Sequence, residues 1–211
     1  MDPDVLEDTP IQESLTVARE NWRDYRDVFE HGDEIATNPL LANSNKFADF
    51  LKDYRVSRMI RQRTHDKFRG TLKDSPQFEE AIHDDTGHSL DKLESELRPD
   101  FGTHEPPRRM ISVLSKVAAF IIPERFVAWD RYAKKGVNIV LGRRASSPFN
   151  AYADYLAAFD EAWNGQAGQQ IRDYLSRVGA NDAVESEPRF LRRVLDVYLM
   201  KCGDRKLKGA G

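Results

Sequence analysis

The stretch MISVLSKVAAFIIPERFVAWD, residues 110–130, decides the fold class. Up to Pro123 its apolar side chains recur every three or four residues, which is the period of an α-helix with one buried face. Pro123 then ends that helix, because proline cannot continue the backbone hydrogen-bond ladder. The same spacing recurs along almost the whole chain of 211 residues, and only residues 137–141 would pass as a strand. The sequence therefore predicts an all-α fold.

The pattern predicts a compact single-domain helical array. Residues 1–10 form an acidic flexible tail, residues 11–203 the helical domain and residues 204–211 a frayed C-terminal tail. A chain of this length can bury one sizeable core without disulfides. Breaks at glycine and proline divide the domain into helices. These are expected at about 11–31, 44–61, 78–83, 89–99, 108–122, 150–163, 169–178 and 188–201.

Cysteine usage and hydropathy indicate a cytoplasmic protein. Cys202 is the only cysteine, so no disulfide forms within the chain and a reducing compartment is expected. The longest apolar run, residues 117–122, is far shorter than the roughly 20 residues that cross a bilayer. The N-terminus is acidic, whereas a secretory signal begins with basic residues. No membrane partner is expected.

The charge is segregated along the chain although its net value is only -3. Residues 55–69 hold six basic residues against one acid, and residues 105–144 hold nine against three. One basic face on an acidic body is typical of a protein that binds the DNA backbone. The alternative is two ordinary solvated helix faces. Arg55, Arg58 and Arg61 are expected to share one face of the helix that Ser44 caps.

Lys116 is a candidate for chemistry because it lies at a seam of its predicted helix. One side of that helix is apolar, and the other carries small residues such as Ser112 and Ser115. A lysine in such a place can be partly desolvated, which favours the neutral, nucleophilic amine. The alternative is a surface lysine whose stem lies along apolar neighbours.

Asp130 is the candidate carboxylate. Aromatic residues and cations surround it in the sequence. Burial among aromatic rings raises the pKa of a carboxyl group and nearby cations lower it, and such shifts are common in active sites. The alternative is that Asp130 caps the N-terminus of a helix that begins at Arg131. The surrounding residues are Phe126, Trp129, Tyr132, Arg131, Lys134 and Lys135.

The run SKVAAFIIP, residues 115–123, continued to Trp129 and Asp130, resembles the catalytic stretch of the helix-hairpin-helix DNA glycosylases, especially the 8-oxoguanine type. The resemblance covers about thirty residues and implies a DNA glycosylase fold, with Lys116 as the catalytic lysine and Asp130 as the catalytic aspartate. The family's hairpin glycines are absent, since residues 110–114 contain none.

This resemblance implies an enzyme that binds double-stranded DNA, flips a base and cleaves its N-glycosidic bond without a cofactor or a metal ion. A lyase step follows if Lys116 attacks, and the missing hairpin favours an unusual target such as modified phage DNA in antiviral defence. The base pocket is then expected to contain Phe126, Trp129 and Tyr132. The residues expected to bind DNA are Arg55, Arg58, Arg61, Arg108, Arg109, Ser115, Arg131, Lys134 and Lys135.

Two other classes of function compete with the enzyme. The first is a non-catalytic helical protein that binds DNA or acts by interaction in defence, with Asp130 as a cap and Lys116 as a phosphate contact. The second is a metal-dependent nuclease that uses His83 and His88. These histidines are five residues apart and do not share a helix face, and residues 86–87 mark a turn, so a solvated loop is expected there instead.

Overall fold

A computed structural model describes residues 8–31, 34–60, 62–101, 110–180 and 183–204. The described residues contain no β-strand, so the predicted all-α class is confirmed. The helices are α1 (Asp8–Asp24), α2 (Arg26–Phe29), α3 (Pro39–Ala42), α4 (Ser44–Asp53), η1 (Ser57–Met59), η2 (Gln62–Thr64), α5 (His65–Lys73), α6 (Pro76–His83), α7 (His88–Phe101), α8 (Ile111–Ile121), α9 (Arg131–Val140), α10 (Tyr152–Asn164), α11 (Gln166–Val178), η3 (Ala183–Ser186) and α12 (Pro188–Asp204), where η marks a 3-10 helix.

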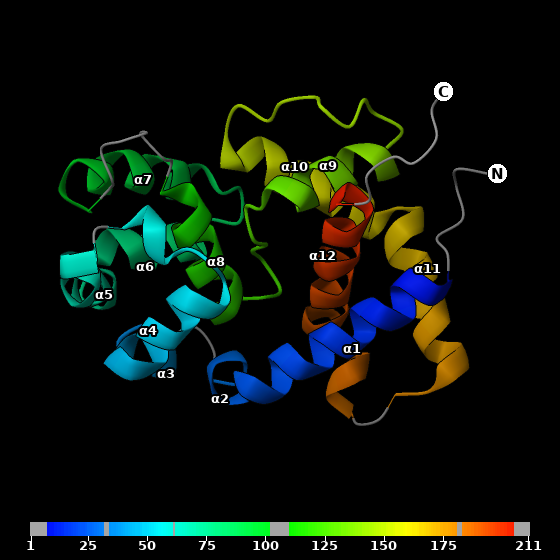
Figure 1. Cartoon of the computed structure of the whole chain (residues 1–211), viewed down its shortest axis with the longest axis horizontal. Coiled ribbons are helices and arrows are strands. Elements are labelled where there is room, and N and C mark those ends of the chain that lie inside the picture. Colours follow the sequence, from blue (N-terminus) through cyan, green and yellow to red (C-terminus); the bar gives the residue numbers. More distant parts are fainter. Residues whose placement is uncertain (1–7, 32–33, 61, 102–109, 181–182, 205–211) are drawn as a thin grey trace. The chain divides into compact units, whose positions relative to one another are not determined.

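The helices group into two compact units (Figure 1). Unit 1 contains α1, α9, α11, η3, α12 and the part of α10 from Asp154 onward. Unit 2 contains α2 to α8, the loop up to Trp129 and residues 151–153 at the start of α10. The single domain over residues 11–203 stays a prediction.

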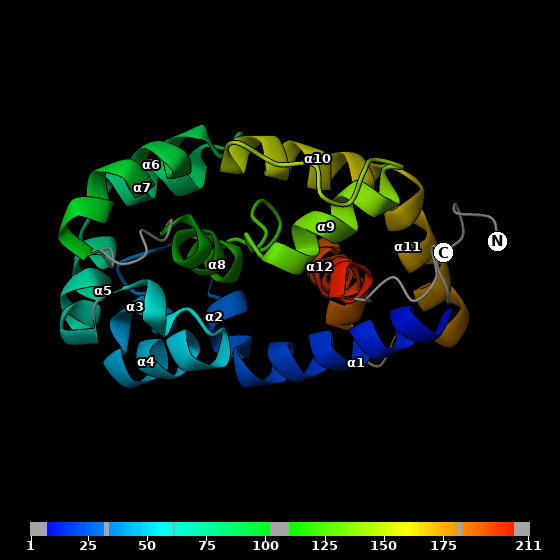
Figure 2. The same cartoon turned by 45° about the horizontal axis from the view of Figure 1, so that its top comes forward.

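Unit 1 is built around α12. Figure 2 shows this helix end-on, with α1, α9 and α11 around it. The contact with α9 depends on Gly136, because a Cβ atom there would lie 2.0 Å from the Leu199 carbonyl oxygen. At Gly203 a Cβ atom would lie 1.9 Å from the Tyr132 carbonyl oxygen. The two helices therefore touch backbone to backbone, which only glycine permits at these positions.

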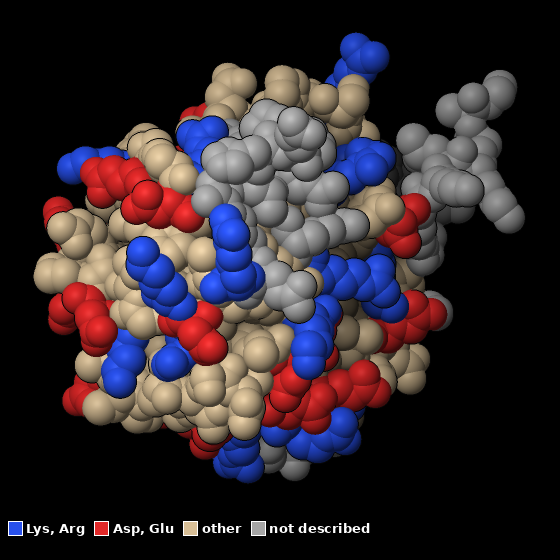
Figure 3. All heavy atoms as spheres, turned by 60° about the vertical axis from the view of Figure 1, so that its left-hand side comes forward, with Lys and Arg blue, Asp and Glu red and all other residues tan. Residues whose placement is uncertain are grey.

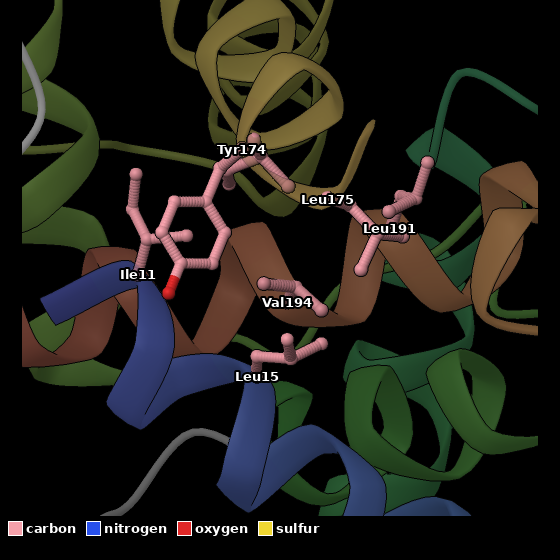
Figure 4. A pocket seen from close by; sticks show the side chains of 7 residues that line it. Ile11, Leu15, Tyr174, Leu175, Leu191 and Val194 are labelled. Carbon is pink, nitrogen blue, oxygen red and sulfur yellow. The ribbon is translucent and has the colours of Figure 1, made fainter. Parts of the chain in front are cut away.

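The side of α12 that faces α1 and α11 is an apolar seam (Figure 4). Side chains from the three helices point toward one another and leave only a small gap among them. The Tyr174 hydroxyl is the one polar group on the side chains that line this gap, so the gap serves packing rather than chemistry. Its lining residues are Ile11, Leu15, Ile171, Tyr174, Leu175, Leu191 and Val194.

Unit 2 is built around α8, which Figure 2 shows among α2 to α7. All residues of α8 except Ser112 are buried, as expected for a helix that is apolar on most sides. Phe120 forms the centre of an aromatic cluster. Its ring centroid lies 4.6 Å from that of Tyr54, 4.8 Å from that of Phe29 and 5.1 Å from that of Phe50. This cluster joins α8 to α2 and to the C-terminal end of α4.

The predicted long helix from residue 44 to 61 is wrong. Asn43, not Ser44, caps α4, and the helix ends at Asp53. Arg55 follows with a φ of 53°, and the N–H of Val56 donates to the Leu51 carbonyl at 2.9 Å. This is a Schellman turn, in which glycine usually occupies the position that Arg55 has here. Because glycine is absent here, the sequence contains no sign of this helix end. Arg55 and Arg58 follow the end of α4 and therefore do not share a helix face.

Smaller differences have similar causes. Residues 137–141 lie in and just after α9 rather than in a strand, because Gly136 lets that helix close onto α12. Residues 65–73 form α5 although no helix was predicted there, and Gly70 lies inside it. Pro99 lies inside α7, which continues to Phe101. Gly203 lies within α12 rather than ending it. The predicted helix 11–31 is interrupted at Tyr25 between α1 and α2.

Candidate functional site

Lys116 lies in unit 2 with only 8% of its surface exposed. Its Nζ donates a hydrogen bond of 3.0 Å to the carbonyl oxygen of Tyr54, the C-cap residue of α4. The last carbonyl groups of a helix carry partial negative charge and bind cations favourably. The alternative of a surface lysine is therefore wrong, and Lys116 is a buried cap of α4.

A second polar contact lies beside this cap. The Tyr25 hydroxyl donates a hydrogen bond of 2.7 Å to Asp53 Oδ2, at the last residue of α4. Burial raises the pKa of the Tyr25 phenol far above its ordinary value, and the hydrogen bond to the Asp53 carboxylate raises it further. The phenol therefore remains protonated and acts as a donor. Its ring lies 5.2 Å from Phe120 and 5.9 Å from Tyr54.

Ser115 has a structural role that differs from the predicted DNA contact. It is fully buried, and its Oγ accepts a hydrogen bond of 2.9 Å from the backbone N–H of Trp129. A hydroxyl in this position cannot reach a phosphate, so we correct its assignment. The bond fixes to α8 the segment that leads to Asp130, since Trp129 is the residue before it.

Two of the three predicted base-pocket rings are buried. Phe126 is 1% exposed and stacks on Tyr152 with ring centroids 6.5 Å apart, and Trp129 is 8% exposed. The Tyr152 hydroxyl also bonds to the backbone N–H and carbonyl of Val127. Both rings therefore belong to the core of unit 2, and the prediction that a flipped base contacts Phe126 is wrong in this conformation. Tyr132, in unit 1, is 37% exposed.

Asp130 caps the N-terminus of α9 in unit 1. Its Oδ1 accepts a hydrogen bond of 2.7 Å from the backbone N–H of Tyr132, so the predicted capping role is confirmed. The residue is half-buried rather than enclosed. The N-terminus of a helix can hold the carboxylate of a capping aspartate in one orientation through one of its oxygens, while the other oxygen interacts with another group. A catalytic role is compatible with this geometry.

The structure describes the side chains of some of the predicted DNA-binding cations but not of the others. Arg131 is exposed on α9, Lys134 and Lys135 are half-buried there, and Arg55 is exposed after α4. The side chain of Arg58 and the whole of residues 61, 108 and 109 lie outside the part of the chain that the structure describes. Over α4 to α7, Figure 3 shows basic and acidic side chains interspersed rather than a separate basic face.

The loop that holds His83 and His88 is organised by Asp84. Its carboxylate accepts hydrogen bonds from the backbone N–H of Ser89 at 2.7 Å and from the Thr86 hydroxyl at 2.6 Å. Partial burial acts to raise the pKa of Asp84, but these hydrogen bonds outweigh it and lower the pKa to about 2. Among the described residues, no three His, Cys, Asp or Glu side chains lie together as a metal ion requires.

Neither a protein-family model nor a curated protein nor a solved structure matches this chain. No helix in the described part of the chain is long and apolar enough to span a bilayer.

Sequence reasoning missed the residues at the end of α4, where Lys116 binds. Asp53 and Tyr54 were read as the middle of a helix, and Tyr25 as one more apolar position. The only available signal was weak, since an acid and a tyrosine next to each other are common on helices. Their role depends on where α4 ends, and Arg55 gave no sign of that end.

Proposed function

We propose that this protein is a DNA glycosylase-like enzyme, which binds double-stranded DNA, flips one nucleotide and hydrolyses its N-glycosidic bond with water as the nucleophile. The support is the resemblance of residues 115–130 to the catalytic stretch of such enzymes together with the way this stretch is held. Trp129 is bound through its N–H to Ser115, and Asp130 is bound through its Oδ1 to the N–H of Tyr132. Trp129 is thus held within unit 2 and Asp130 within unit 1, and a catalytic group needs such local support.

Asp130 is the carboxylate that carries the chemistry in this proposal. When the N-glycosidic bond breaks, its electron pair leaves on the base nitrogen and positive charge develops on the sugar. A fixed carboxylate stabilises that charge. Water then adds to the anomeric carbon and gives its proton to Asp130, while the released base takes up a proton. The products are a free base and an abasic sugar.

In this proposal Lys116 is a structural residue of unit 2 rather than the nucleophile. Its amine is buried and bound to the carbonyl at the end of α4, where a positive charge is stabilised. An amine bound to a helix end in this way is not directed at a sugar. The proposal therefore includes base release without a covalent enzyme–DNA intermediate, and strand cleavage does not follow from base release.

The rival proposal, a non-catalytic DNA-binding protein, is favoured by one observation. Asp130 caps α9, which by itself explains an aspartate at this position. Asparagine and serine cap helices about as well as aspartate, whereas alanine does not. Substitutions of Asp130 can therefore separate capping from catalysis.

The experiment is incubation of the protein with genomic and phage DNA, followed by mass spectrometry of the released bases. Under the enzyme proposal, Asp130→Asn and Asp130→Ser lower base release by about 100-fold or more while their thermal stability stays at the wild-type value. Asp130→Ala lowers base release and also destabilises the fold by about 1 kcal/mol. DNA binding by the wild type with no base released from any DNA would leave the rival proposal in place.

A further inference from the structure

The segment that begins with α9 is a long stretch of the chain whose charged residues are all basic. Residues 131–153 contain five basic residues and no acid, in a chain whose net charge is -3. The basic residues are Arg131, Lys134, Lys135, Arg143 and Arg144.

One side of α9 is unavailable because it packs on α12. Ala133 and Val137 are fully buried, and Gly136 touches the backbone of Leu199. The opposite side carries Arg131, Lys135 and Ile139 at i, i+4 and i+8, with Tyr132 next to them. These four residues, here called the α9 stripe, span about 12 Å along the helix axis. That length corresponds to about three nucleotides of a stacked strand.

The α9 stripe exposes an aromatic ring between its two cations and an aliphatic side chain one turn after Lys135. Only three large hydrophobic residues are exposed in the described chain, and two of them are Tyr132 (37%) and Ile139 (40%). The Arg131 guanidinium lies 5.7 Å from the centre of the Tyr132 ring. Among the described residues, no carboxylate pairs with Arg131 or with Lys135.

The loop after α9 is held by a buried side chain. Asn138 is 1% exposed, and its Nδ2 donates to the Ser147 carbonyl at 2.9 Å. The backbone carbonyl of Asn138 accepts a hydrogen bond of 2.7 Å from the backbone N–H of Arg143. The Arg143 guanidinium is bound to Glu161, which leaves Arg144 exposed without a carboxylate partner in the described part of the chain. The backbone of the loop is therefore held, and the loop presents one exposed cation.

Cations in a row with an exposed aromatic ring among them fit a strand of DNA whose bases are unpaired. Such strands are bound through their phosphates by Lys and Arg and through base stacking on aromatic rings. A paired duplex offers no free base face to Tyr132. An anionic membrane would need a wide apolar face, and the α9 stripe has only one ring and one isoleucine.

We propose that the α9 stripe and Arg144 bind the strand that becomes unpaired when a nucleotide is flipped, with phosphates on Arg131, Lys135 and Arg144 and one base stacked on Tyr132. This inference rests on the proposed function for its partner, since it names which form of DNA the same enzyme recognises.

The test is fluorescence anisotropy with three labelled DNAs: a single strand, a duplex with a short unpaired bubble and a fully paired duplex. The wild type is expected to bind the first two more tightly than the third. Tyr132→Ala should weaken single-strand binding by roughly 5- to 100-fold, whereas Tyr132→Phe, which keeps the ring, should leave it within about twofold. Lys135→Ala should lower the salt dependence of log affinity by about 0.7, the value for one phosphate of a single strand.

The control for loss of an exposed cation elsewhere in unit 1 is Arg177→Ala. Arg177 is an exposed arginine of unit 1 that lies 5.6 Å from the Tyr174 ring, much as Arg131 lies beside Tyr132. This variant should bind single-stranded DNA as the wild type does. Unchanged single-strand binding in Tyr132→Ala and Lys135→Ala, with unchanged melting temperatures, would overturn the proposal. Equal loss of single-strand and paired-duplex binding in Tyr132→Ala would also overturn it, as would equally strong competition by anionic lipid vesicles.

Failure of this inference is distinguishable from failure of the proposed function. If Tyr132→Ala releases bases and binds strands normally, the α9 stripe is not the strand site although the enzyme proposal stands. If the wild type binds unpaired DNA through Tyr132 but releases no base, the α9 stripe is supported and the glycosylase proposal is wrong.

Discussion

Substitution of Gly136 by alanine should destabilise the protein through the contact between α9 and α12. The added Cβ atom would lie 2.0 Å from the Leu199 carbonyl oxygen, 2.6 Å from its carbonyl carbon and 2.8 Å from its Cα. These atoms belong to the backbone of a buried helix and cannot rotate away. The two helices must therefore separate by roughly 1 Å, which loosens the packing of α9 on α12.

Overpacking of a core usually lowers the free energy of unfolding by about 1–3 kcal/mol, and we expect a clash with backbone atoms to lie near the upper value. We therefore expect a loss of about 3 kcal/mol in the free energy of unfolding. For a chain of this length that loss lowers the melting temperature by roughly 6–12 °C. Because Asp130 and Tyr132 belong to α9 and its cap, base release and strand binding should fall as well.

The assay is thermal and urea unfolding followed by circular dichroism at 222 nm. Gly70→Ala is the matched control, because Gly70 lies inside α5 and no atom lies within 4 Å of the Cβ position. This control should stabilise the fold by about 0.5–1 kcal/mol, since alanine is the better helix former. A melting temperature of Gly136→Ala within about 1 °C of the wild type would refute the close backbone contact.

Further predictions concern residues of unit 2. Arg55→Gly should raise the free energy of unfolding by about 1 kcal/mol in urea unfolding, because glycine adopts the left-handed backbone conformation without strain, and a fall in stability would contradict this. If Arg55 contacts a phosphate, the same substitution should lower the salt slope of duplex binding by about 0.9 in a salt titration. Lys116→Met should lower the free energy of unfolding by about 1–2 kcal/mol in thermal unfolding, because the hydrogen bond to the Tyr54 carbonyl is lost. The wild type should form no covalent adduct with DNA in borohydride, and a trapped adduct would show that Lys116 is the nucleophile. The lowered pKa of Asp84, about 2 against an ordinary 3.8, stabilises the fold above about pH 4 and this contribution is lost as the pH falls toward 2. Urea unfolding of Asp84→Asn should show a weaker dependence on pH in that window, and a dependence like that of the wild type would count against the Asp84 contacts.

The sequence predicted the fold class and most helices because their signals are local. The apolar period places α8, and the buried residues Leu15, Ala18 and Trp22 lie on the predicted face of α1. Local patterns of this kind do not depend on which other helix lies nearby.

The errors arose where tertiary contacts decide. The local pattern gives no reason for Gly136 and predicts a helix end before Gly203, but each glycine is needed where a helix touches the backbone of another. The end of α4 is set by the burial of Leu51 and Val56 on either side of a Schellman turn, and this outweighs the cost of the left-handed Arg55. No periodicity shows such a turn when glycine is absent.

The candidate site divides in the same way. The motif of residues 115–130 identified Lys116 and Asp130, and Asp130 as a cap followed from the sequence, since the cap lies next to its own helix. The role of Lys116 did not follow, because its amine binds the carbonyl of Tyr54, which is 62 residues away in the chain. A lysine at a seam between apolar and small residues is equally suited to attack a sugar or to neutralise the end of a helix. The bond of its amine to the carbonyl at the end of α4 favours the second role. Catalysis in our proposal therefore depends on the carboxylate of Asp130 and on water, and Lys116 supports the fold of unit 2.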